Sequence, residues 1–118
     1  MVLSWDPEAV AAFLGVPAVF RDNSTYLFEF HTSGGSATLE VLPYLGEVRL
    51  AIRNGQTTWA TWILDCAAIR FIDEIPEEGG PGLAFEPLRP AGTKLTHWVC
   101  LGRGKDGIEV DTIFQGDF

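Results

Sequence analysis

Hydrophobic and polar residues alternate with a period of two along most of this chain. Aromatic side chains occupy every second position between residues 26 and 31, and aliphatic side chains repeat the pattern at residues 48–52. Successive side chains of a strand point to opposite faces, so this period predicts strands with one buried face. Asn54 and Gly55 then form the residue pair preferred in type I′ hairpins, and a further strand is expected at residues 57–64.

The same reading predicts more strands on both sides of this hairpin. A turn at Ser33 to Ser36 is expected to precede a strand at residues 38–42. Pro87 and Pro90 interrupt the strand expected at residues 83–86 and predict that it lies at an edge of the sheet. Residues 65–68 allow either a bulge or a single helical turn. The additional strands are expected at residues 38–42, 67–73, 83–86, 96–101 and 108–114.

One helix is expected, over residues 7–14. Asp6 can cap it, Pro7 suits its first position, and Gly15 ends it. Its apolar residues recur at intervals of three and four, so the helix has one apolar stripe to cover the sheet. The connections between strands are too short for βαβ crossovers.

These patterns together predict a mainly β protein, α+β at the margin. We expect residues 1–118 to form one domain with a curved antiparallel sheet, a partial barrel or sandwich of seven or eight short strands. The helix at residues 7–14 precedes a β-meander over residues 25–114.

Charge narrows the range of partners. The chain has 16 acidic and 8 basic side chains, a net charge of −8, which repels nucleic acid and anionic lipid surfaces. No apolar run approaches the roughly 20 residues of a membrane span, and the N-terminus lacks the pattern of a secretory leader. We therefore expect a cytoplasmic protein that binds neither nucleic acid nor membrane.

Four residues are of the types that bind zinc, namely His31, Cys66, His97 and Cys100. None of their spacings matches a zinc-binding motif, so we expect reduced thiols in the core and no metal or other cofactor. A single disulfide between Cys66 and Cys100 is the alternative if the strands that contain them are neighbours.

Catalytic motifs are weak. No serine or cysteine lies in a recognisable nucleophile motif, so no catalytic residue is assigned and the interpretation leans away from an enzyme. Residues 102–107 match the phosphate-binding pattern G-x-G-x-x-G, but a strand pattern follows where a helix is required. This segment is expected to be a hairpin loop whose Arg103 and Lys105 keep the tip soluble.

The leading hypothesis is a non-catalytic protein-binding domain, such as an acidic inhibitor or immunity-type protein for a basic partner. The densest acidic cluster lies in a Pro/Gly-rich loop, where it can adapt to a basic surface. Trp59 and Trp62 must face opposite ways on a regular strand, which leaves one of them outside the main core. The residues expected to bind the partner are Asp73, Glu74, Glu77, Glu78 and Trp62.

Two alternatives belong to other functional classes. A small-ligand-binding or enzymatic domain would have its site on the concave face of the sheet, with a pocket drawn from His31, His97 and Trp98. A self-assembling structural domain would form a homodimer through edge strands that prolines leave unpaired.

Overall fold

The computed structural model describes residues 3–21, 25–32, 34–73, 75, 80–88, 95–104 and 107–116, with the backbone alone at 59, 95–98, 104 and 111–116. Within these residues the chain forms one helix, α1 (Pro7–Leu14), and eight strands. The strands are β1 (Val19–Arg21), β2 (Thr25–Thr32), β3 (Gly35–Leu42), β4 (Glu47–Asn54), β5 (Thr57–Ile72), β6 (Gly82–Pro87), β7 (Leu95–Gly104) and β8 (Gly107–Gly116).

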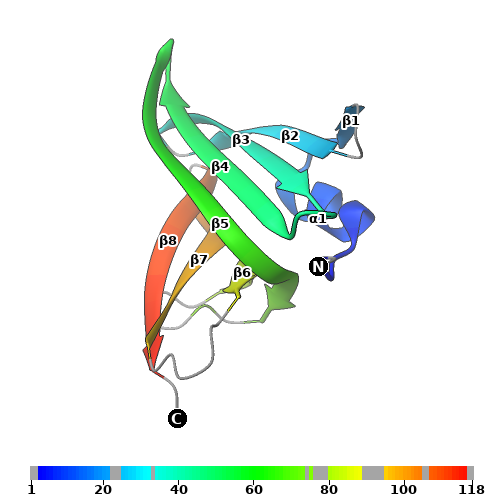
Figure 1. Ribbon diagram of the computed structural model, residues 1–118. Coiled ribbons are helices and arrows are strands. Elements are labelled where there is room, and N and C mark those ends of the chain that lie inside the picture. Colours follow the sequence, from blue (N-terminus) through cyan, green and yellow to red (C-terminus); the bar gives the residue numbers. More distant parts are fainter. Residues whose placement is uncertain are drawn as a thin grey trace.

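The strands form one sheet in which spatial order follows chain order, and consecutive strands are antiparallel. The sheet curls until β8 meets β2 through one parallel pairing, between Thr32 and Ile108. Figure 1 shows the resulting curvature, with the long strand β5 crossing in front of β7 and β8. The expected fold class, a mainly β protein with a curved antiparallel sheet, is confirmed.

Helix α1 has the bounds and caps that the sequence predicts. The Asp6 carboxylate accepts hydrogen bonds from the backbone N–H groups of Glu8 and Ala9, at 3.0 and 3.4 Å. Gly15 ends the helix with a φ of 73°, a left-handed conformation that glycine adopts without strain. The buried residues of α1 are Val10, Phe13 and Leu14, and they pack into the main core. We call the face of the sheet that points toward this core the inner face, and the opposite one the outer face.

The alternation of the strands decides which side chains reach this core. Phe28 and Phe30 of β2, Leu39 and Val41 of β3 and Leu50 of β4 are all buried in one cluster with α1. A fully buried Phe or Leu side chain contributes about 1.5–3 kcal/mol. The helix is short, and its burial against this face stabilises it.

Strand β5 is longer than expected because two predicted strands are continuous. A register shift between Cys66 and Ala68 bends it, so that its first half pairs with β4 and its second half with β6. The alternatives at residues 65–68 are thus resolved as a bulge. Beyond the bend β5 no longer pairs with β4, and Ser4 lies beside it instead. The Ser4 N–H donates to the Ala67 carbonyl, and the Ser4 carbonyl accepts from the Ile69 N–H.

The prediction that residues 83–86 form an edge strand is wrong. Strand β6 lies between β5 and β7, and Pro87 is tolerated because it is the last residue of the strand. The homodimer hypothesis loses the proline-interrupted edge on which it was based, and dimerisation itself remains a prediction. Strand β1 was missed, because its three residues are too few for an alternating pattern to be recognised.

A second, smaller group of buried side chains lies on the other face of β6 and β7. Ala84 and Cys100 pair across these strands, and both are buried. Ile75 follows β5 and packs where Gly82 leaves room, since a Cβ on Gly82 would lie 2.6 Å from the Ile75 Cδ1. The Ile75 N–H donates to the Gly80 carbonyl at 2.8 Å, and the Ile75 side chain is buried.

The structure contains two cysteines, neither of them in a disulfide, and both are buried. Among the described residues, no helix is long and apolar enough to cross a membrane.

Ionisation of Cys66 is expected to destabilise the protein at alkaline pH. Burial away from water raises the pKa of this fully buried thiol from 9.0 to about 12. The folded state therefore keeps its proton above pH 9.0, whereas the unfolded state loses it. The free energy of unfolding should fall as the pH rises through this window, by up to about 1.4 kcal/mol per pH unit.

The measurement is urea unfolding of the protein and of Cys66→Ser at about pH 8 and about pH 10.5. The serine variant should lose less stability between the two conditions, because its hydroxyl does not titrate there. Equal losses in the two proteins would contradict the assignment to Cys66.

Candidate functional site

One row of paired residues crosses five strands on the outer face of the sheet. Strand pairing places Val19 beside Leu27, Leu27 beside Glu40, Glu40 beside Arg49, and Arg49 beside Ile63. The two ends of the row are apolar and exposed, at 51% for Val19 and 65% for Ile63. We call the surface formed by this row and the adjoining residues Leu42, Leu45, Glu47 and Asp65 the Arg49 face.

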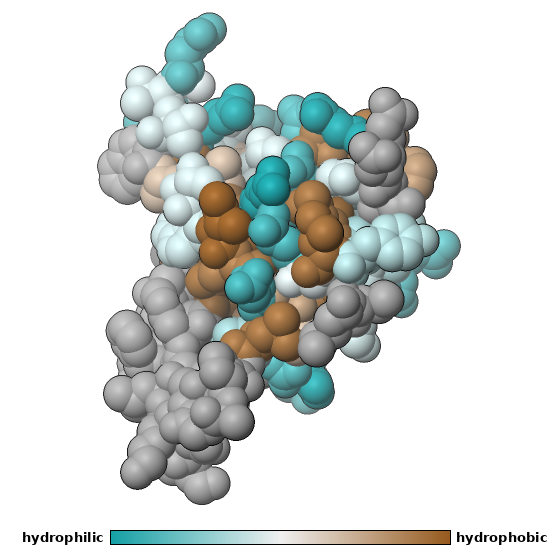
Figure 2. Space-filling view, viewed as in Figure 1, coloured by the Kyte–Doolittle hydropathy of each residue, from teal (hydrophilic) through white to brown (hydrophobic). Residues whose placement is uncertain are grey.

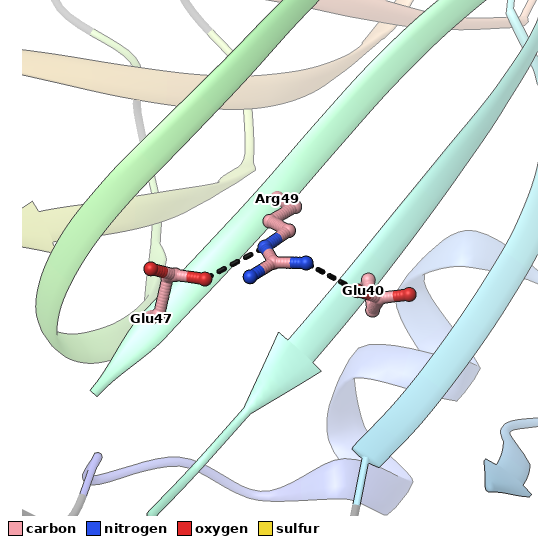
Figure 3. A network of polar contacts seen from close by, with 3 residues as sticks. All are labelled: Glu40, Glu47 and Arg49. Atoms are coloured by element: carbon pink, nitrogen blue, oxygen red, sulfur yellow. Dashed lines mark hydrogen bonds and ion pairs between the residues drawn. The ribbon is translucent and has the colours of Figure 1, made fainter. Parts of the chain in front are cut away.

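Arg49 lies at the centre of this face and binds two carboxylates (Figure 3). Its Nε is 2.6 Å from the Glu47 Oε2, and its NH1 is 3.5 Å from the Glu40 Oε1. The Arg49 side chain stays 47% exposed, so solvent screens these ion pairs and they add little to stability. Their main effect is to hold the guanidinium group in one orientation on the surface.

The carboxylate excess lies at one border of the Arg49 face. Asp65 is directly opposite Glu47 across β4 and β5, an arrangement in which like charges repel. Asp65 is exposed, and its side chain makes no ion pair with any described residue. Glu40, Glu47 and Asp65 carry three negative charges, and the single positive charge of Arg49 balances one of them. This border can therefore accept a further positive charge.

Exposed hydrophobic side chains surround these charges. Figure 2 shows hydrophobic residues on both sides of a hydrophilic strip over this face of the molecule. Tyr44 and Leu45, in the turn between β3 and β4, are 69% and 65% exposed. A shallow groove of about 510 Å³ runs between β1 and Arg49, and its described lining is Phe20, Arg21, Thr25, Glu40, Leu42 and Arg49. Contiguous apolar surface rimmed by polar groups is typical of protein-binding sites.

The inner face has a hollow of its own, where β8 meets β2. Its volume is about 750 Å³. The described lining is mostly apolar, with polar groups from the strand ends: Thr32, Gly34, Ile52, Arg53, Asn54, Ala60, Trp62, Ile108, Glu109 and Val110. The Thr32 Oγ1 is buried, and no hydrogen-bond partner for it lies among the described residues.

Two of the five residues predicted to bind a partner are described, Trp62 and Asp73, and neither belongs to the Arg49 face. Trp62 pairs with Leu50 on the inner face, where it is half-buried and lines the hollow. Asp73 is exposed after the end of β5. Glu74, Glu77 and Glu78 lie outside the described residues.

The three residues proposed for a ligand pocket are not brought together by any described contact. His31 is exposed on the outer face of β2, beside a depression of about 230 Å³ that also includes Glu29 and Arg53. His97 and Trp98 lie in β7, and their side chains are outside the described part of the chain.

Arg103 has a structural role that the sequence analysis did not predict. The hairpin expected at residues 102–107 is present, with Gly104 paired to Gly107. Arg103 donates to the Phe13 carbonyl and lies over the Phe13 ring, with its Cζ 5.0 Å from the centroid. It thereby stabilises the C-terminus of α1, where a cation is favoured.

Among the described residues no three His, Cys, Asp or Glu side chains lie close enough together to hold a metal ion. With its raised pKa, the Cys66 thiol is protonated at neutral pH, so it is not activated as a nucleophile.

The fold defines the class of protein: an eight-stranded antiparallel meander, curled around one N-terminal helix. Its likeness to a solved structure is extensive. A chain of a contact-dependent growth inhibition toxin–immunity protein complex from Klebsiella pneumoniae 342 matches with a TM-score of 0.75 and 13% sequence identity. The match covers 97% of this chain and 98% of that chain, so the two share a fold throughout. No protein-family model and no curated protein matches the sequence.

Proposed function

We propose that this protein is a non-catalytic, immunity-type protein that binds and neutralises a basic toxin in the cytoplasm. The observation that carries the proposal is the fold shared over the whole chain with a member of a toxin–immunity complex. A shared fold alone does not fix a function, so the proposal also depends on a surface suited to a protein partner. The buried thiol of Cys66, which forms no disulfide, fits a reducing compartment.

The Arg49 face supplies that surface. Its exposed Ile63, Leu45 and Val19 can be buried against a partner, and apolar burial is the main source of affinity. A lysine or arginine of the partner between Glu47 and Asp65 would relieve the repulsion of these carboxylates. The Glu40–Arg49–Glu47 network presents a fixed guanidinium group for an acceptor on the partner.

The net charge of −8 acts at longer range. It attracts a basic protein and raises the association rate, an effect that salt weakens. In this account the acidic loop with Asp73, Glu74, Glu77 and Glu78 contributes to steering, and Asp65 contributes to the contact itself.

Charge reversal separates these two contributions. A basic toxin domain, sought among the genes next to the one that encodes this chain, is co-expressed with it, and the captured complex can be titrated by calorimetry and surface plasmon resonance. Asp65→Lys should weaken binding by about tenfold or more, mainly through faster dissociation. Asp73→Lys should mainly slow association, and only at low salt.

Glu8→Lys is the matched control, because it makes the same charge change at the exposed start of α1. It should leave affinity within about threefold of the unsubstituted protein. Failure of every neighbouring toxin domain to bind would contradict the immunity function. Equal losses for all three variants would show that net charge alone drives binding and that the Arg49 face is not the contact.

A further inference from the structure

We propose that the hollow on the inner face is a binding site for a flat, mostly apolar and uncharged organic molecule. This inference goes beyond the binding of a protein partner, because the hollow faces the other side of the sheet from the Arg49 face. It depends on the walls, the volume and the charges of the hollow.

The walls come from strand positions that face the core. Ile52 pairs with Ala60, and Leu50 pairs with Trp62, so these four side chains share the inner face. Leu50 is fully buried, whereas Trp62, opposite it, is only half-buried and lines the hollow. The small Ala60 leaves space beside the indole, and an indole provides a broad apolar surface on which a flat molecule can stack.

One end of the hollow lies where β2 meets β8. Thr32 and Ile108 pair and line the hollow there. The Thr32 Oγ1 is itself covered by protein atoms, so this end of the hollow offers no hydroxyl group to a bound molecule.

Size and charge define the class of ligand. A volume of about 750 Å³ lies within the range of roughly 300–1,000 Å³ typical of small-molecule sites. Arg53 and Glu109 both contribute to the described lining, and their opposite charges leave no net charge to select an ion. The lining thus favours an uncharged aromatic molecule over an anion or a cation.

The test uses N-phenylnaphthylamine, an uncharged aromatic amine that fluoresces in apolar surroundings, and the purified protein alone. We expect saturable binding of one probe per protein. Ala60→Trp fills the hollow and should weaken binding by about tenfold or more. Thr61→Trp is the matched control, since Thr61 is the next residue of β5 and is exposed on the outer face, and it should bind the probe as the unsubstituted protein does.

A further variant keeps the test decisive. Ala60→Leu fills less space and should give an intermediate loss if Ala60→Trp fails to fold. Absence of saturable binding, or equal binding by the Ala60 and Thr61 variants, would overturn the proposal. Because no toxin is present, such a failure would leave the proposed immunity function untouched.

Discussion

Replacing Ile63 by lysine is expected to raise the dissociation constant of the complex with a basic toxin by about a hundredfold. Ile63 is 65% exposed at the end of the row that contains Arg49. The substitution removes an apolar anchor and places a second cation beside Arg49, against a basic partner. Since the side chain is exposed in the free protein, the free energy of unfolding should change by no more than about 0.5 kcal/mol.

Gln56→Lys is the control for this substitution. Gln56 is exposed in the turn between β4 and β5, outside the Arg49 face, and its replacement by lysine makes the same charge change. Calorimetric titration should give nearly the same affinity for this variant as for the unsubstituted protein. A large loss with Gln56→Lys, or none with Ile63→Lys, would place the partner elsewhere on the molecule.

Replacing Gly35 by alanine should lower the free energy of unfolding by about 3 kcal/mol. Gly35 begins β3 with a φ of 156°, which residues with a Cβ rarely adopt. A Cβ at this position would also overlap the backbone carbonyl oxygen of Arg53. That oxygen belongs to β4, so the clash can be relieved only by a shift of the strand pairing.

The neighbouring Gly34 provides the comparison. A Cβ on Gly34 would have no atom within 4 Å, so Gly34→Ala should cost less than about 1 kcal/mol. Urea unfolding of both variants measures the difference. Similar stabilities for the two would show that β3 and β4 tolerate the clash, and would contradict the close approach at Gly35.

Local patterns predicted a large part of the fold. The cap at Asp6 and the stop at Gly15 determine α1 from adjacent residues alone. The alternation of residues 26–31 and 48–52, together with the turn at Asn54 and Gly55, was enough to predict the central hairpins. These signals depend on neighbours in the chain, so one sequence is sufficient to read them.

Features that depend on distant residues could not be predicted in this way. Arg103 and Phe13 are 90 positions apart, and no spacing rule connects them. The place of β6 inside the sheet follows from its pairing with β7, whereas its prolines suggested an edge. Ser4 completes the sheet beside Ala68 only because β5 bends there.

The candidate site illustrates the same limit. The sequence analysis chose the acidic loop after Asp73 because its charges are adjacent along the chain. The Arg49 face has its charges and apolar residues on separate strands, and strand register alone brings Glu40, Arg49 and Ile63 side by side. The visible signal was the alternation of the polar residues Glu47, Arg49 and Arg53 with apolar ones, which predicted a solvated strand face without showing what lay next to it.

The most direct test of the account is a binding footprint by nuclear magnetic resonance. Amide and methyl signals of the labelled protein would be followed as an unlabelled toxin domain is added. The account predicts that the changes centre on β4 and the first half of β5, around Arg49, Ile63 and Asp65, and that the hollow beside Trp62 is unaffected. Changes confined to β6–β8 or to the loop after Asp73, with the Arg49 face unperturbed, would contradict it.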